Sequence, residues 1–135
     1  MVFKERIATM FPAVNAEPAL SVTLNNKTDL MSIPVFVSLF KIHFEKKYTL
    51  TIALRRENGE FVTSRDFNIE VQKSSGNGYI MSDGTVNITG QFTMGGISIE
   101  NIKDGETMQL LGTLQVDSIF NPETSIFSYF EIRIR

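Results

Sequence analysis

The stretch YTLTIALRRENGEFVTSRDFNIEV, residues 48–71, carries the clearest structural signal in this sequence. Apolar and polar residues alternate along both halves, which is typical of strands that bury one face. Between the halves lies Asn58-Gly59, a pair that favours a tight hairpin because both residues tolerate positive φ. The sequence therefore predicts a β-hairpin. Its buried residues are expected to be Tyr48, Leu50, Ile52, Leu54, Phe67, Ile69 and Val71.

Similar alternation recurs in short runs along the rest of the chain. These runs cover residues 20–26, 33–44, 85–94, 97–101, 107–118 and 125–135. Together with the hairpin they make about eight strands, and many short strands at such spacing favour a sandwich or barrel. We find no linker and no internal repeat. The prediction is an all-β fold, a single-domain antiparallel β-sandwich of about eight strands over residues 1–135.

Two adjacent glycines, Gly95-Gly96, separate two apolar runs of opposite parity. Phe92 and Met94 occupy even positions before the glycines, whereas Ile97 and Ile99 occupy odd positions after them. A two-residue hairpin would place all four side chains on one face, and a glycine bulge in one long strand would also shift the parity. We favour the hairpin because Gly-Gly suits its turn. A phosphate-binding loop is disfavoured, since no Lys follows the glycines.

The N-terminal segment differs from the rest in its apolar spacing. Phe3, Ile7, Met10 and Val14 follow helical spacing, but Pro12 disfavours a long helix. We therefore expect residues 1–19 to form a short helix or an irregular arm that covers one sheet or an edge.

Composition excludes several classes of protein. The 135 residues carry a net charge of −2, which argues against a nucleic-acid binder. The chain has no cysteine, so it has no disulfide and no thiolate metal site. We also expect no signal peptide, because Lys4, Glu5 and Arg6 interrupt the apolar residues at the start of the sequence, and no apolar run is long enough to cross a membrane. From this we expect a soluble, cytoplasmic protein.

No catalytic motif is present. The single histidine, His43, lies between Lys41 and Glu45, on a face that is expected to be solvated. If successive strands simply alternate in direction, the loops at 45–47, 73–84 and 101–106 share one end of the sandwich. Their acidic residues are interspersed with lysines, which makes a calcium site improbable. We predict no catalytic residue, no metal site and no cofactor, and hence no enzyme.

The strongest functional hypothesis concerns strands that are apolar on both faces. Such strands are either covered twice or belong to an interface. The candidate interaction face consists of Val35, Val37, Leu39, Phe127 and Tyr129. It predicts a non-catalytic module that contacts a protein partner or forms a homo-oligomer, unless the N-terminal arm covers this face. The alternative is a small-ligand or carbohydrate-binding module that uses the loop at residues 73–84.

Overall fold

The computed structural model describes residues 4–14, 17–73, 78–116 and 124–135. This part of the chain folds into strands and contains no helix. The strands are β1 (Arg6–Val14), β2 (Glu17–Pro18), β3 (Ser21–Leu24), β4 (Met31–Ile42), β5 (Tyr48–Arg56), β6 (Phe61–Ile69), β7 (Tyr79–Ile80), β8 (Val86–Ile97), β9 (Thr107–Val116) and β10 (Ile126–Ile134).

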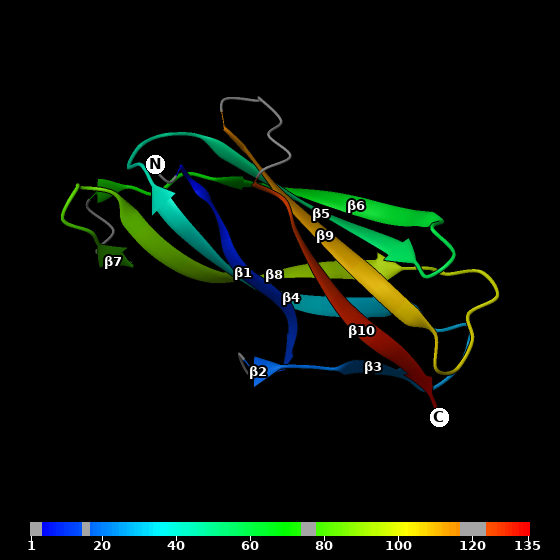
Figure 1. The fold of residues 1–135 in the computed structure, drawn as a ribbon. Helices are drawn as coiled ribbons and strands as arrows, with labels where there is room; N and C mark the ends of the chain where they lie inside the picture. Colours follow the sequence, from blue (N-terminus) through cyan, green and yellow to red (C-terminus); the bar gives the residue numbers. More distant parts are fainter. Residues whose placement is uncertain (1–3, 15–16, 74–77, 117–123) are drawn as a thin grey trace.

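The strands form two five-stranded sheets that lie face to face (Figure 1). The first sheet has the order β2-β1-β4-β8-β7, and the second has the order β3-β10-β9-β5-β6. Neighbouring strands are antiparallel except β3 and β10, which are parallel. The predicted all-β sandwich is therefore confirmed, although one pairing departs from the expected antiparallel pattern.

The core lies between the sheets, where alternate residues of each strand meet. Leu50, Ile52 and Leu54 of β5 are fully buried, as the alternation predicts. Met10 of β1 packs closely over Gly112 of β9, where an added Cβ would lie 2.5 Å from the Met10 sulfur. The absence of a side chain at Gly112 thus lets the two sheets approach one another at this point.

The predicted hairpin joins β5 to β6 and is confirmed. Its turn is longer than a two-residue turn: Gly59 N donates to Arg56 O, and Arg56 N donates to Glu60 O. Gly59 has a φ of 90°, whereas Asn58 does not have a positive φ and instead accepts a hydrogen bond from Glu60 N. The turn therefore needs left-handed backbone only at the glycine.

The hairpin expected at Gly95-Gly96 is wrong, because β8 runs through both glycines as one strand. Met94 pairs with Ile33 of β4, and Ile97 pairs with Met31. Three steps along β8 thus match two steps along β4, so the glycines form a bulge. Gly96 has a φ of 64°, and the bulge leaves both Met94 and Ile97 buried.

The helix proposed for the N-terminus is also wrong, since residues 6–14 form β1 between β2 and β4. The spacing that imitates a helix arises from a bulge: Ile7 pairs with Leu39 and Thr9 with Ser38, which leaves Ala8 as the extra residue. Ile7 and Met10 are three residues apart, yet both are buried. This segment is a strand within the first sheet and not a cover over it, and Phe3 lies outside the described residues.

The two adjacent glycines of the bulge provide a matched pair of variants. Gly96→Ala places a side chain on left-handed backbone and is expected to destabilise the fold by about 1 to 2 kcal/mol. Gly95→Ala should change stability by less than about 0.5 kcal/mol, because its Cβ would meet only Ser32 Oγ at 3.7 Å. Urea denaturation of both variants measures the difference. Equal losses would contradict the bulge geometry.

A polar clamp fixes the connection between β8 and β9 to the end of β5. Arg56 donates to both carboxylate oxygens of Glu106, at 2.6 and 2.9 Å, and also to the backbone oxygens of Glu100 and Asn101. Both side chains of the pair are only 12% exposed. Because β8 is one continuous strand, this loop lies at the end of β5 opposite to residues 45–47, so the prediction that it shares their end is wrong. The described parts of the loop at 73–84 do lie near residues 45–47, since Tyr48 pairs with Ile69 and Asp83 lies 3.5 Å from Lys41.

The clamp should make stability depend on pH. The hydrogen bond from Arg56 lowers the pKa of Glu106, despite the opposing effect of burial. The unfolded state therefore binds the proton more readily, and the stabilisation is complete above about pH 4.5 and lost as the pH falls further. Glu106→Gln should cost about 1 to 3 kcal/mol at neutral pH, and its deficit should shrink in acid.

Chemical denaturation of this variant at several pH values tests the expectation. Glu100→Gln is the control, because it removes a charge from the same loop while the backbone oxygen that Arg56 contacts remains. A Glu106→Gln protein as stable as the parent at neutral pH would show that the clamp contributes nothing.

Candidate functional site: the outer faces of the two sheets

The residues of the predicted interaction face do not lie together. Val35, Val37 and Leu39 of β4 point into the core and are at most 2% exposed. Phe127 and Tyr129 lie on β10 in the second sheet, and they are 51% and 58% exposed. A single surface composed of all five side chains is therefore not formed.

The opposite face of β4 carries two phenylalanines, Phe36 and Phe40, so this strand is apolar on both faces. Phe36 is half-buried on the outer face of the first sheet, where it stacks on Phe11 of β1 with ring centroids 5.1 Å apart. Phe40 is half-buried on the same face. Because β1 lies beside β4, cross-strand contacts shelter part of these rings from water.

Phe127 and Tyr129 belong to a wider apolar area on the outer face of the second sheet. We call this area the second-sheet face. The strand register forms two rows across β10, β9, β5 and β6. One row consists of Tyr129, Gln109, Arg55 and Phe61, and the other of Phe127, Leu111, Ala53 and Ser64.

Side chains in adjacent rows lie roughly 7 Å apart along each strand, so the rows form one continuous surface. Gln109 Nε2 donates to the Tyr129 hydroxyl at 3.1 Å, which fixes the tip of that ring. Phe61 is 58% exposed, and Leu111 is partly exposed. Neither residue was expected on this face from the sequence, although in a strand the adjacent pair Leu110-Leu111 must turn one leucine outward.

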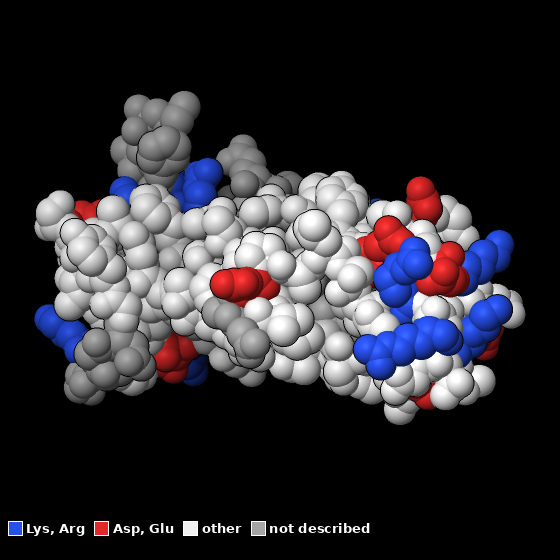
Figure 2. Space-filling model, turned by 90° about the horizontal axis from the view of Figure 1, so that it is seen from below, with Lys and Arg blue, Asp and Glu red and all other residues white. Residues whose placement is uncertain are grey.

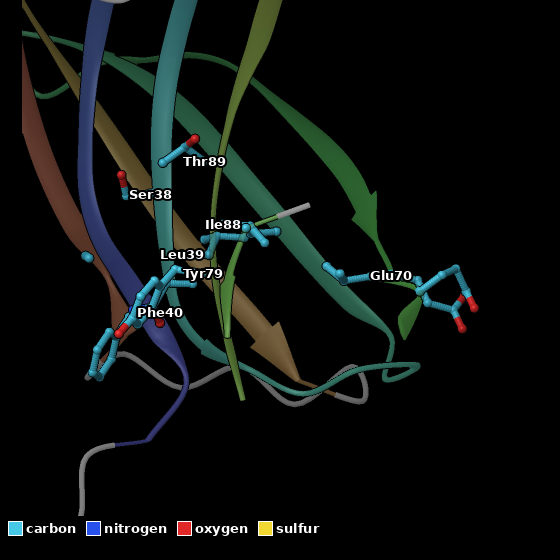
Figure 3. A pocket seen from close by; sticks show the side chains of 12 residues that line it. Ser38, Leu39, Phe40, Glu70, Tyr79, Ile88 and Thr89 are labelled. Atoms are coloured by element: carbon cyan, nitrogen blue, oxygen red, sulfur yellow. The ribbon is translucent and has the colours of Figure 1, made fainter. Parts of the chain in front are cut away.

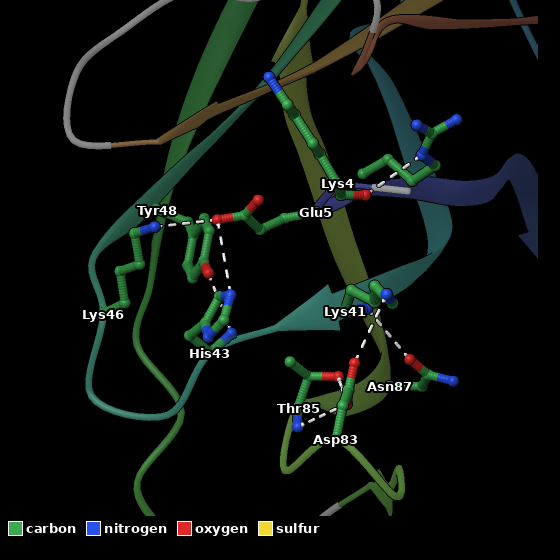
Figure 4. A network of polar contacts seen from close by, with 10 residues as sticks. Lys4, Glu5, Lys41, His43, Lys46, Tyr48, Asp83, Thr85 and Asn87 are labelled. Atoms are coloured by element: carbon green, nitrogen blue, oxygen red, sulfur yellow. Dashed lines mark hydrogen bonds and ion pairs between the residues drawn. The ribbon is translucent and has the colours of Figure 1, made fainter. Parts of the chain in front are cut away.

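A network of charged and polar residues lies at the end of the sandwich near the start of β1 (Figure 4). Glu5 accepts a hydrogen bond from Lys46 Nζ at 2.9 Å and lies 4.0 Å from the ring of His43. Burial alone would raise the pKa of Glu5, but the hydrogen bond and charge of Lys46 lower it. His43 is largely exposed, as predicted, and the network joins β1 to the connection between β4 and β5.

A second part of this network fixes the turn between β7 and β8. Asp83 accepts hydrogen bonds from the backbone and hydroxyl of Thr85, and these bonds lower its pKa. Lys41 Nζ lies 3.5 Å from the same carboxylate. Lys41 has a φ of 60°, and its backbone N–H donates to Asn87 Oδ1 at 3.1 Å. The described residues hold no group of three His, Asp or Glu placed to bind a metal ion.

A groove of about 760 Å³ borders this network (Figure 3). It lies at the edge of β8, beside β7 and the segment that follows β6. Its lining includes Ser38, Phe40, Glu70, Tyr79, Asn87 and Thr89. Tyr79 belongs to the loop at 73–84 that the sequence suggested for ligand binding; residues 74–77 of that loop lie outside the described part of the chain.

Charged side chains are unevenly distributed over the surface. On the side drawn in Figure 2, Lys and Arg lie toward the two ends, and the middle is uncharged apart from acidic atoms near its centre. The ends are where the described loops and turns lie (Figure 1). No helix in the described residues is long and apolar enough to cross a membrane.

The geometry defines a β-sandwich module of two five-stranded sheets. A comparison with protein-family models finds no match, and a search of curated proteins finds none either. Among solved structures, the fold is similar to that of a bacterial adhesin from Mobiluncus mulieris, described as containing intramolecular disulfide, isopeptide and ester bond cross-links. The TM-score is 0.61 at 12% sequence identity. The similarity covers 97% of this chain but only 58% of the adhesin chain, and at this identity it concerns the fold alone.

Proposed function

We propose that this chain is a non-catalytic β-sandwich module that acts through protein-protein contact at the second-sheet face. The observation that carries the proposal is the exposure of Phe61, Phe127 and Tyr129 around the partly exposed Leu111, in two adjacent rows. Large apolar side chains gathered on one side of a sheet are costly to leave in water and mark interaction surfaces.

The chemistry of this face suits a protein surface. Aromatic residues are enriched in protein interfaces, and the hydroxyl of a tyrosine lets it contact both apolar and polar partners. Arg55 supplies one charge to the row that contains Tyr129 and Phe61. The partner that can be tested first is a second copy of this chain, because a symmetric dimer buries the same patch on both copies.

The fold comparison supports a module of this kind in one respect. The similar solved structure is described as an adhesin, a description that names no catalytic activity. The cross-links named for that protein are not part of the proposal. This sequence has no cysteine and therefore no disulfide. Lys41 and Asp83 lie side by side as an ion pair, 3.5 Å apart, and not as a covalent cross-link.

Sedimentation velocity over a wide range of concentrations tests the proposal. The parent chain is expected to associate as its concentration rises, and the double variant Phe127→Ser, Tyr129→Ser should weaken association at least about tenfold, or about 1.4 kcal/mol. Its melting temperature should change little, because both side chains are more than half exposed. Leu20→Ser is the control, since Leu20 is exposed and lies outside the second-sheet face.

A parent chain that stays monomeric at the highest concentration would contradict self-association at this face. Val37→Asp should affect folding instead of association. Val37 is only 1% exposed, so a buried carboxylate there should unfold the protein rather than change its assembly.

A further inference from the structure

A second surface with different chemistry lies on the first sheet, at the groove beside β7. On the outer face of the first sheet, the register sets a row of side chains across β4, β8 and β7. Tyr79 of β7 pairs with Asn87 of β8. On the other side of Asn87, the bulge of β4 places both Phe40 and Lys41 opposite it. Two aromatic rings thus flank one amide. In the neighbouring row, the hydroxyl residues Ser38 and Thr89 are paired.

Tyr79 is exposed, but its backbone is held closely against β8. A Cβ at Gly78 would lie 2.6 Å from Asn87 O and less than 3 Å from side-chain carbons of Val86 and Ile88. Gly78 also has a φ of 87°, which disfavours any other residue. This contact sets the position of Tyr79, whose side chain is 72% exposed at the groove.

Asn87 is oriented by the bulge at Lys41. Because the bulge adds a residue to β4, the Lys41 N–H does not pair with a backbone oxygen of β8. It donates a hydrogen bond to Asn87 Oδ1 at 3.1 Å instead. Because that backbone group can only donate, the oxygen must face it, and Nδ2 must point the other way. No described residue accepts a hydrogen bond from Nδ2. The fold therefore supplies a fixed amide donor between two aromatic rings.

The charges around the groove disfavour an anionic ligand. Lys41 is paired with Asp83, and Glu70 is among the residues that line the groove (Figure 3). The hydroxyl row and the aromatic stack of Phe11 on Phe36, farther along the same face, add no charge. An uncharged ligand with many hydroxyl groups and an apolar ring face is complementary to this arrangement.

We propose that the groove binds a neutral saccharide. The C–H face of a sugar ring packs on Tyr79 and on the exposed part of Phe40, while Asn87 Nδ2 donates to a ring or hydroxyl oxygen. Ser38 and Thr89 donate to or accept from neighbouring hydroxyls. This site lies on the first sheet, and it is independent of the protein contact proposed for the second-sheet face.

An array of defined neutral and anionic oligosaccharides, followed by titration calorimetry with the glycans that bind, tests the proposal. The parent chain should bind neutral glycans. Tyr79→Ala should weaken binding at least about tenfold, because it removes the exposed stacking surface.

Asn87→Asp is the sharper variant. It keeps the oxygen that caps the Lys41 N–H but replaces the donor Nδ2 with an acceptor, so the fold should survive while affinity falls about tenfold. Thermal denaturation checks that the melting temperature stays close to that of the parent. Leu20→Ser, at an exposed residue outside both proposed surfaces, should bind glycans as the parent does.

Four results would overturn the proposal. The first is that the parent binds no neutral glycan on the array, and the second is that it binds only anionic ones. The third is that neutral glycans bind equally well to the parent, Tyr79→Ala and Asn87→Asp. Loss of binding in Phe127→Ser but not in Tyr79→Ala would likewise place saccharide recognition on the other sheet and contradict this site.

Discussion

The first sheet depends on three bulges that keep apolar side chains on its core face. Each bulge adds one residue to a strand, so two buried residues that would be two positions apart lie three apart. The pairs are Ile7 and Met10 in β1, Leu39 and Ile42 in β4, and Met94 and Ile97 in β8. Without the extra residue, each strand would turn its later apolar side chains toward water.

These bulges also explain which parts of the fold were predictable. In β5 the alternation is unbroken, and the buried face and the hairpin followed directly from it. In the first sheet a spacing of three was read as a helix at Ile7 and as a hairpin at Gly95-Gly96, because both structures also produce that spacing. In β4, the alternation places Val35 and Phe36 on opposite faces of the strand, but it does not show which of the two faces the core. That choice depends on which side of the first sheet the second sheet covers, and sequence alternation does not specify this.

The bulge at Lys41 connects the fold to the candidate saccharide site. It frees a backbone N–H, the N–H fixes the amide of Asn87, and the amide lies beside Tyr79. The second-sheet face is regular by comparison and presents its apolar rows through register alone. Under the two proposals both outer faces of the sandwich take part in recognition, one through rows of apolar side chains and one through oriented polar groups.

The most direct test is to measure the pairing of β4 with β8 in solution. These two strands lie at the middle of the first sheet, and all three bulges belong to that sheet. Nuclear Overhauser effects between backbone protons of these strands measure the pairing without altering the sequence. A bulged, continuous β8 predicts contacts of Ile33 with Met94 and of Met31 with Ile97. Cross-strand contacts of Phe92 with Ile99, without those of Ile33 with Met94, would show a hairpin at Gly95-Gly96 and contradict the account.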